Sequence, residues 1–121
     1  MGKPYTSALP YRMVEGGIVA VTDGVQLEIE LDPSYRHSFA GVEFYSDAEG
    51  TTPVTPSGGT VTFELKTPLQ PNAFQSFTLN AISAASADQV NWGTNALAVR
   101  ATLSSVVGAA YARLRATMNI S

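Results

Sequence analysis

The sequence predicts an all-β protein: an antiparallel β-sandwich or jelly roll of about eight short strands, with an extended N-terminal arm. From Gly17 onward, apolar and polar side chains alternate with a period of two, which is the period of a half-buried strand. Turn-forming residues interrupt this alternation at intervals of roughly 8–12 residues, as in sandwiches. Only 14% of the residues are charged and 45% are hydrophobic, which favours a compact domain over a disordered chain.

The predicted arm comprises residues 1–16, and the sandwich domain comprises residues 17–121. The arm contains Pro4 and Pro10 and has no steady period, so it is not expected to form an element alone. We expect it to lie on the body of the chain or on a neighbouring subunit, and to become ordered only where a partner supplies extra surface. Its large apolar residues are Tyr5, Leu9, Tyr11 and Met13.

Three strands are predicted in the first part of the domain. Residues 17–21 form a short strand, and residues 25–31 (VQLEIEL) have the clearest alternation in the chain. The Asp-Gly pair at 23–24 separates them and predicts a hairpin. After the break at DPSYRHS, the stretch FAGVEFYS resumes the alternation with Val42 and Phe44 directed inward.

The rest of the domain alternates between turns and strands. Residues 47–59 contain two prolines and three glycines and are predicted to be turns throughout. Two later stretches, TPLQPNAFQ and AASADQ, are predicted to be connections. The remaining predicted strands are TVTFELK, SFTLNAIS, VNW, NALAVRATL and YARLRATMN.

Residues 107–118 fit two periods. Their apolar side chains also have helical spacing: Val107, Ala110, Tyr111, Leu114 and Met118. We favour a strand, because LRATM at 114–118 repeats the Arg-Ala-Thr of VRATL at 99–103, where a helix is less expected.

The repeated Arg-Ala-Thr places arginines on the outer faces of two strands. Arg100 belongs to the first copy, and Arg113 and Arg115 belong to the second. Directly opposed arginines would repel, so they are not expected to face one another. Glu28 and Glu30 have the same two-residue pitch, which predicts an acidic ladder beside a basic one, within the chain or across a subunit boundary. An anion or nucleic-acid site on these arginines is the alternative, and a net charge of −3 weakens it.

No motif predicts catalysis, and we expect a non-enzymatic protein without cofactor or metal. The single histidine, His37, is predicted in a loop; the chain has neither a Gly-x-Ser-x-Gly elbow nor the ligands of a zinc site, since it lacks cysteine. Glu28 and Glu30 share one strand face and therefore cannot flank a sugar from both sides. The loop SDAEGTT lacks the regular oxygen spacing of an EF-hand, although a loop calcium remains an alternative.

Trp92 carries the main alternative function. With Tyr45 and Tyr111 it predicts a carbohydrate-binding β-sandwich module, in which the indole ring stacks on a sugar. The competing interpretation, which we favour, is an anchor at the edge of the core whose indole N–H finds a hydrogen-bond partner. A sugar-induced change in tryptophan fluorescence would separate the two.

The sequence also bears on location. The first residues lack the apolar stretch of a secretory signal, and no apolar run approaches the ~18 residues of a membrane span. We therefore expect synthesis in a cytoplasm and no association with membrane or nucleic acid.

The stretch from about residue 59 to residue 121 combines a Thr-Val-Thr strand, a proline loop and VNWGTNALAVRATLSSVVGAAYARLRATMNIS. It resembles the small β-sandwich virion proteins of tailed bacteriophages, which include capsid decoration proteins and collar or tail accessories. The resemblance implies a homo-oligomeric structural subunit of the virion, with capsid or tail subunits as partners. No site motif carries over from it. The candidate contact residues come from the arm and the ladder: Tyr5, Leu9, Tyr11, Met13, Glu28, Glu30, Arg100, Arg113 and Arg115.

Overall fold

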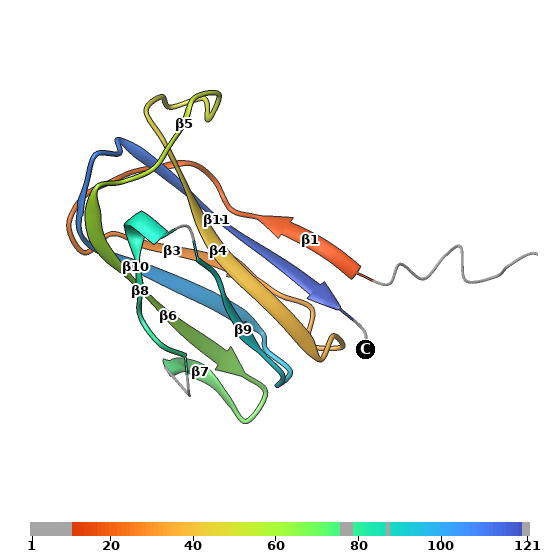
Figure 1. Ribbon diagram of the computed structural model, residues 1–121. Coiled ribbons are helices and arrows are strands. Elements are labelled where there is room, and N and C mark those ends of the chain that lie inside the picture. The colour runs from red at the N-terminus through yellow and green to blue at the C-terminus, as the bar shows by residue number, and fades with distance from the viewer. Residues whose placement is uncertain (1–10, 76–78, 87, 120–121) are drawn as a thin grey trace, which may run out of the picture.

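The computed structural model describes residues 11–75, 79–86 and 88–119, which form two antiparallel sheets packed face to face (Figure 1). Sheet A contains β1 (Tyr11–Glu15), β2 (Val19–Ala20), β4 (His37–Tyr45), β5 (Pro53–Val54), β9 (Val90–Trp92) and β11 (Tyr111–Asn119). Sheet B contains β3 (Gln26–Glu30), β6 (Gly58–Thr67), β7 (Gln70–Gln75), β8 (Ile82–Ser83) and β10 (Ala98–Val107). The predicted antiparallel sandwich is confirmed.

The two copies of the Arg-Ala-Thr repeat lie at the centres of opposite sheets. Sheet A has the order β1-β11-β4-β5, with β2 also on β11 and β9 also on β4. Sheet B has the order β3-β10-β6-β7, with β8 also on β6. The strand interpretation of 107–118 is confirmed for its second half, because β11 begins at Tyr111 and pairs with β4 along its whole length.

The core lies between the sheets and follows the predicted alternation. Along β11 every second residue from Ala112 to Met118 is buried, and the arginines occupy the outer positions between them. Burying these apolar side chains is the main favourable contribution to folding. The largest fully buried side chains of this core are Phe63, Leu65, Leu103, Leu114, Met118, Val61 and Val99.

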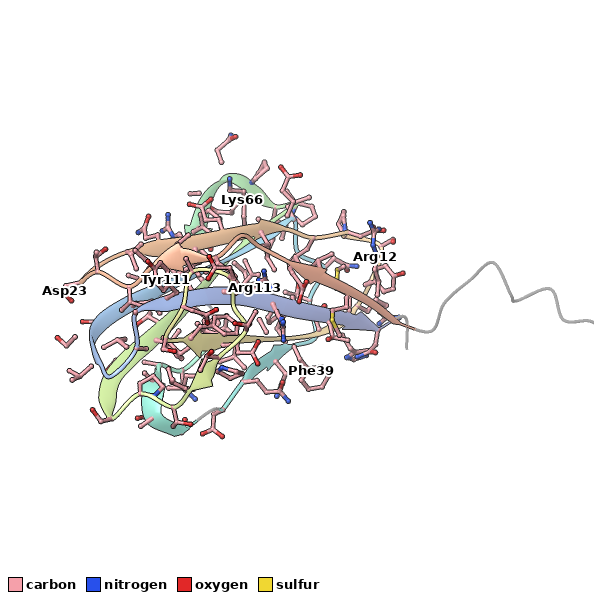
Figure 2. All side chains as sticks on the ribbon, turned by 90° about the horizontal axis from the view of Figure 1, so that it is seen from above. Arg12, Asp23, Phe39, Lys66, Tyr111 and Arg113 are labelled. Carbon is pink, nitrogen blue, oxygen red and sulfur yellow. The ribbon has the colours of Figure 1, made fainter. Side chains whose placement is uncertain are left out.

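The predicted hairpin at residues 23–24 is wrong. β2 pairs with β11 and β3 pairs with β10, so the chain crosses from sheet A to sheet B at this turn. Val25 N donates to Thr22 O (3.1 Å), and Gly24 adopts a φ of 81° while its N–H donates to Leu103 O. The Asp-Gly pair does form a turn, but the central strands β10 and β11 take both runs as partners. Figure 2 shows Asp23 and Arg12 at opposite ends of the sandwich.

The predicted boundary of the arm at residue 16 also differs from the structure. Residues 11–15 form β1, which pairs with β11, and Val14 packs against the core. Hydrogen bonds to an otherwise open edge of β11, together with this burial, offset the cost of ordering the strand. Tyr5 and Leu9, the other apolar residues of the arm, lie outside the described residues.

Four smaller predictions need correction. TPLQPNAFQ, expected as a connection, contains β7; Pro71 is tolerated there because β7 is an edge strand. Of SFTLNAIS, only Ile82–Ser83 is a strand among the residues described, and the following loop contains a 3₁₀ turn, η2 (Ala84–Ser86). The turn region 47–59 includes the short strand β5, and His37 begins β4 rather than lying in a loop.

Candidate protein-contact site

On the outer face of sheet B, the arginine of the central strand lies between carboxylates of the flanking strands. Arg100 is in register with Glu28 on β3 and with Glu64 on β6. Its Nη2 lies 2.7 Å from Glu64 Oε1, and its Nη1 lies 3.9 Å from Glu28 Oε2. Phe74 of β7 covers the guanidinium at 4.4 Å from its ring centroid, a cation–π contact that Lys66 shares at 4.8 Å.

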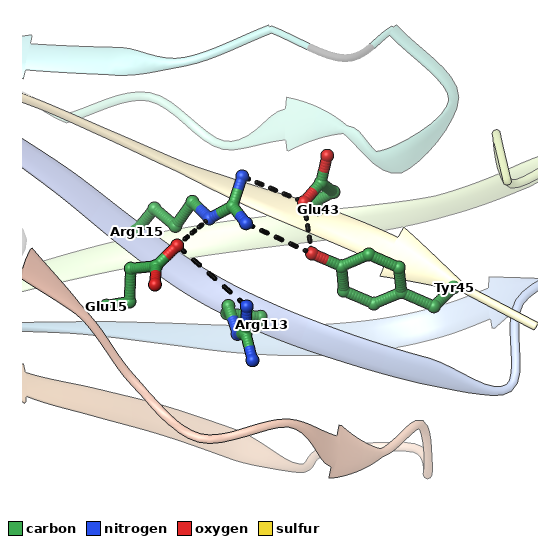
Figure 3. A network of polar contacts seen from close by, with 5 residues as sticks. All are labelled: Glu15, Glu43, Tyr45, Arg113 and Arg115. Atoms are coloured by element: carbon green, nitrogen blue, oxygen red, sulfur yellow. Dashed lines mark hydrogen bonds and ion pairs between the residues drawn. The ribbon is translucent and has the colours of Figure 1, made fainter. Parts of the chain in front are cut away.

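Sheet A has the same arrangement, with acidic strands on both sides of the basic strand β11 (Figure 3). Arg115 lies between Glu15 of β1 and Glu43 of β4: its Nε is 2.5 Å from Glu15 Oε2, and its Nη1 is 2.9 Å from Glu43 Oε1. The Nε contact is an ion pair rather than a hydrogen bond, because the N–H does not point at the oxygen. Arg113 Nη1 lies 3.9 Å from Glu15 Oε2.

The predicted ladder is therefore present within the chain, but its partners differ from those expected. Glu28 and Glu30 are on sheet B, whereas Arg113 and Arg115 are on sheet A, so these pairs do not meet. Glu28 faces Arg100 instead. Glu30 lies opposite Ala98 and makes no ion pair within the described ranges.

We expect a double-mutant cycle to recover this pairing. Arg115→Ala and Glu43→Ala should couple by about 0.5 kcal/mol in urea unfolding, because both side chains are more than a third exposed and solvent weakens the pair. Arg115→Ala and Glu28→Ala should be additive. Coupling in the second cycle and none in the first would contradict the assignment.

Tyr45 closes one end of the sheet A network. It points to the outer side of β4, yet it is only 1% exposed, because the loop at residues 46–52 covers its ring. Its hydroxyl donates a hydrogen bond to Glu43 Oε1, and Arg115 Nη2 lies 3.5 Å from the hydroxyl oxygen. Burial, followed by the hydrogen bond to Glu43, raises the pKa of Tyr45 above its ordinary value.

This raised pKa predicts a loss of stability at alkaline pH. Below about pH 10 both folded and unfolded states keep the phenol proton, so the Tyr45 contribution is constant. Above that pH the unfolded state loses the proton first, and the contribution falls as the pH approaches the folded-state pKa. The difference in unfolding free energy between the wild type and Tyr45→Phe should therefore be constant from pH 7 to 9 and shrink above 10. A difference that grows with pH would contradict the assignment.

Beside this network, the outer side of sheet A has a hollow of about 510 Å³. It lies along β4 between the short strands β9 and β5, where Gly41 contributes no side chain. Met13, Phe39 and Thr117 form one cross-strand row beside it, and Arg115 also lines it. Glu43, Asp88 and Gln89 line it too, so the hollow combines apolar side chains with polar ones.

Met13 and Phe39 are the large apolar side chains that this face presents to solvent, with exposures of 58% and 36%. Met13 was among the predicted contact residues, whereas Phe39 was not. The signal for Phe39 was available: it occupies an outward position in the alternation of FAGVEFYS, where a polar residue is usual. Exposed apolar residues that gather beside a hollow indicate a contact surface.

Two of the three aromatic rings of the carbohydrate alternative, Trp92 and Tyr45, are buried, whereas Tyr111 is half-buried at the start of β11. Trp92 is 8% exposed and belongs to the core, and Tyr45 is covered as well. Neither ring offers a face for stacking on a sugar. Trp92 is thus the predicted core-edge anchor, although its indole N–H has no hydrogen-bond partner in the described part of the chain.

The loop carboxylates stabilise turns. Asp47 accepts hydrogen bonds from the N–H groups of Thr51 and Thr52, and the Thr51 hydroxyl, the largest effect, lowers the pKa of Asp47. Asp32 accepts from Ser34, which likewise lowers its pKa. In residues 11–75, 79–86 and 88–119, no three potential ligands gather in a way that could hold a metal ion. The same residues contain no helix long enough to cross a membrane.

Comparison with known proteins gives one family and one fold likeness. A family model described as "Domain of unknown function (DUF7265)" matches residues 9–121. No curated protein matches the sequence. A solved structure, the SPBc2 prophage-derived protein YomS, has a similar fold with a TM-score of 0.56 and 8% identity, over 89% of this chain and 93% of that one. At this identity the likeness concerns the fold alone.

Proposed function

The chain belongs to the DUF7265 family, and we propose that it is a non-enzymatic structural subunit of a bacteriophage virion that acts through protein–protein contacts. Its place there is that of a capsid decoration, collar or tail accessory protein. The proposed partners are capsid or tail subunits and further copies of the chain.

One observation carries the proposal: the outer face of sheet A joins exposed apolar side chains to a hollow, while Arg115 beside them is neutralised within the chain. Arg115, the arginine that lines the hollow, has both Glu15 and Glu43 as partners. Met13 and Phe39 are left as the features on which a partner gains the most by excluding water.

The fold likeness supports the phage context. YomS is a prophage-derived protein, and the two chains share their architecture over nearly their whole lengths. A β-sandwich is a scaffold that can carry contact surfaces on the outer faces of its sheets, as proposed here for sheet A.

Particle association tests the proposal. Tagged protein would be expressed in cells that release the phage particles whose genome carries its gene. The particles would be banded by density and analysed by mass spectrometry. We expect the wild type in the particle band. Its absence from that band would overturn the virion assignment.

A matched pair of variants tests the surface. Phe39→Asp places a charge beside the hollow of sheet A and should strongly reduce particle association. Thr102→Asp places the same charge on the outer face of sheet B and should leave association unchanged. Equal loss with both variants would contradict the assignment of the surface.

A further inference from the structure

Among the described strands, three of the four sheet edges carry features that discourage another strand from pairing with them. The far edge of sheet A is shared by β5, with two residues, and β9, with three. The far edge of sheet B is shared by β8, with two residues, and β7, which contains Pro71 and so lacks a donor there. β3 carries Glu28 and Glu30 on its exposed face, so a second copy of β3 would bring like charges together.

β1 has no such protection. It is a strand of five residues without proline, and its Met13 is 58% exposed. Beyond it, the register on β11 shifts by one residue between Glu15 and Val19, which is a bulge. The bulge confines the open part of this edge to β1 itself.

The hydrogen bond of Gly16, the residue after β1, shows which backbone groups of β1 point towards β11 and which point away from the sheet. Gly16 N donates to Leu114 O at 2.9 Å, in the same register as the β1–β11 pairs. Hydrogen-bonded positions alternate along an antiparallel pair, so Arg12 and Val14 direct their backbone groups to β11. The N–H and C=O groups of Tyr11, Met13 and Glu15 therefore point away from the sheet.

We propose that β1 is a dimerisation edge, on which β1 of a second copy pairs antiparallel about a two-fold axis at Met13. The outward groups are self-complementary in this register: Met13 faces Met13, and Tyr11 faces Glu15. A ladder of about six backbone hydrogen bonds would join the two A sheets into one continuous sheet. A contact of this symmetry closes, so it yields dimers rather than filaments.

The charged side chains of β1 do not prevent a second copy from pairing with this edge. Arg12 lies 3.6 Å from Asp32, and Glu15 lies 2.5 Å from Arg115, so each charge of β1 already has a partner in its own chain. The two Glu15 side chains stand at opposite ends of the ladder. The Met13 side chains meet at its centre and shield each other from water. This inference names one partner of the proposed subunit, and it does not depend on that subunit belonging to a virion.

Solution mass and amide exchange on the full chain test the pairing without a variant. We expect a mass of twice 12.8 kDa at high concentration and dissociation on dilution. The Met13 and Glu15 amides should exchange roughly tenfold more slowly in the dimer, whereas Arg12 and Val14 should be protected at both concentrations. A monomer up to near-millimolar concentration, or a dimer whose Met13 and Glu15 amides are unprotected, would overturn the proposal.

Matched lysine variants distinguish edge pairing from face stacking. Met13→Lys places two like charges opposite each other at the axis and should weaken the dimer tenfold or more, by rough estimate. Thr117→Lys places the same charge in the same cross-strand row, one strand further from the edge, and should leave the dimer intact. Equal weakening by both variants would show stacking through the outer face and sink the proposal.

A truncation tests the alternative that residues 1–9, rather than β1, join the two copies. If residues 1–9 joined the copies, removing them would dissociate the dimer and overturn edge pairing. We expect the truncated chain to dimerise as the full chain does, because β1 is retained. The particle-association experiment with Phe39→Asp is independent of all three measurements, so the two proposals can fail separately.

Discussion

Replacing Phe63 by alanine is expected to lower the free energy of unfolding by about 3–5 kcal/mol. Phe63 is 0% exposed at the centre of sheet B, and its cross-strand neighbour is Ala101, which is also fully buried. Because small Ala101 lies beside the ring, few neighbouring side-chain atoms can move in to fill the cavity. The loss is a large part of the about 5–15 kcal/mol that stabilises a domain.

Phe39→Ala is the matched control for this prediction. The same substitution at a side chain that is 36% exposed should cost clearly less, about 1–2 kcal/mol, because solvent already surrounds part of the ring. Urea unfolding of both variants gives the comparison. A similar loss for both would mean that Phe39 contributes to folding rather than to a contact surface.

Gly59→Ala is the second substitution with a large expected effect, about 2–5 kcal/mol. Gly59 has a φ of 112°, which residues with a Cβ rarely adopt, and an added Cβ would lie 2.5 Å from Val106 Cα. That clash is with the backbone, so no side chain can turn aside to relieve it. Urea unfolding measures the loss.

The neighbouring glycine provides the control. Gly58 has an ordinary φ, and nothing lies within 4 Å of an added Cβ there, so Gly58→Ala should be nearly neutral. Gly59 lies against a bulge in β10, between Ser104 and Val107, where Ser105 has a φ of 55° and donates its N–H to Asp23 Oδ1 at 2.9 Å. If the two alanine variants were equally stable, this β10 bulge would be able to rearrange.

The positions of the Arg-Ala-Thr repeat explain the uneven distribution of charge along the chain. Nine of the ten carboxylates precede residue 65, and the two arginine-bearing central strands come near the end. Strands from the first half flank strands from the second half in both sheets. Folding therefore brings the acidic and basic halves together on both outer faces, which helps to set register more than it adds stability.

Alternation by itself determined the strands and the faces of their side chains. The stretches that became β3, β6, β10 and β11 were predicted with the buried and outer residues that the structure has. The period of two is a property of the extended backbone and needs no knowledge of neighbours. The outward direction of Arg100, Arg113 and Arg115 followed for the same reason.

Only the tertiary structure decided which strands are neighbours. Arg115 pairs with Glu15, one hundred positions earlier, and nothing local distinguishes Glu15 from Glu28 as its partner. The Asp-Gly turn at 23–24 was expected to join paired strands, yet each run found a longer partner in a different sheet. β1, with no period of its own, is a strand because the edge of β11 was open to it. Which strands pair depends on how segments far apart in the sequence compete for the same sheet edges and the same core. The local sequence pattern therefore does not indicate a strand's partner.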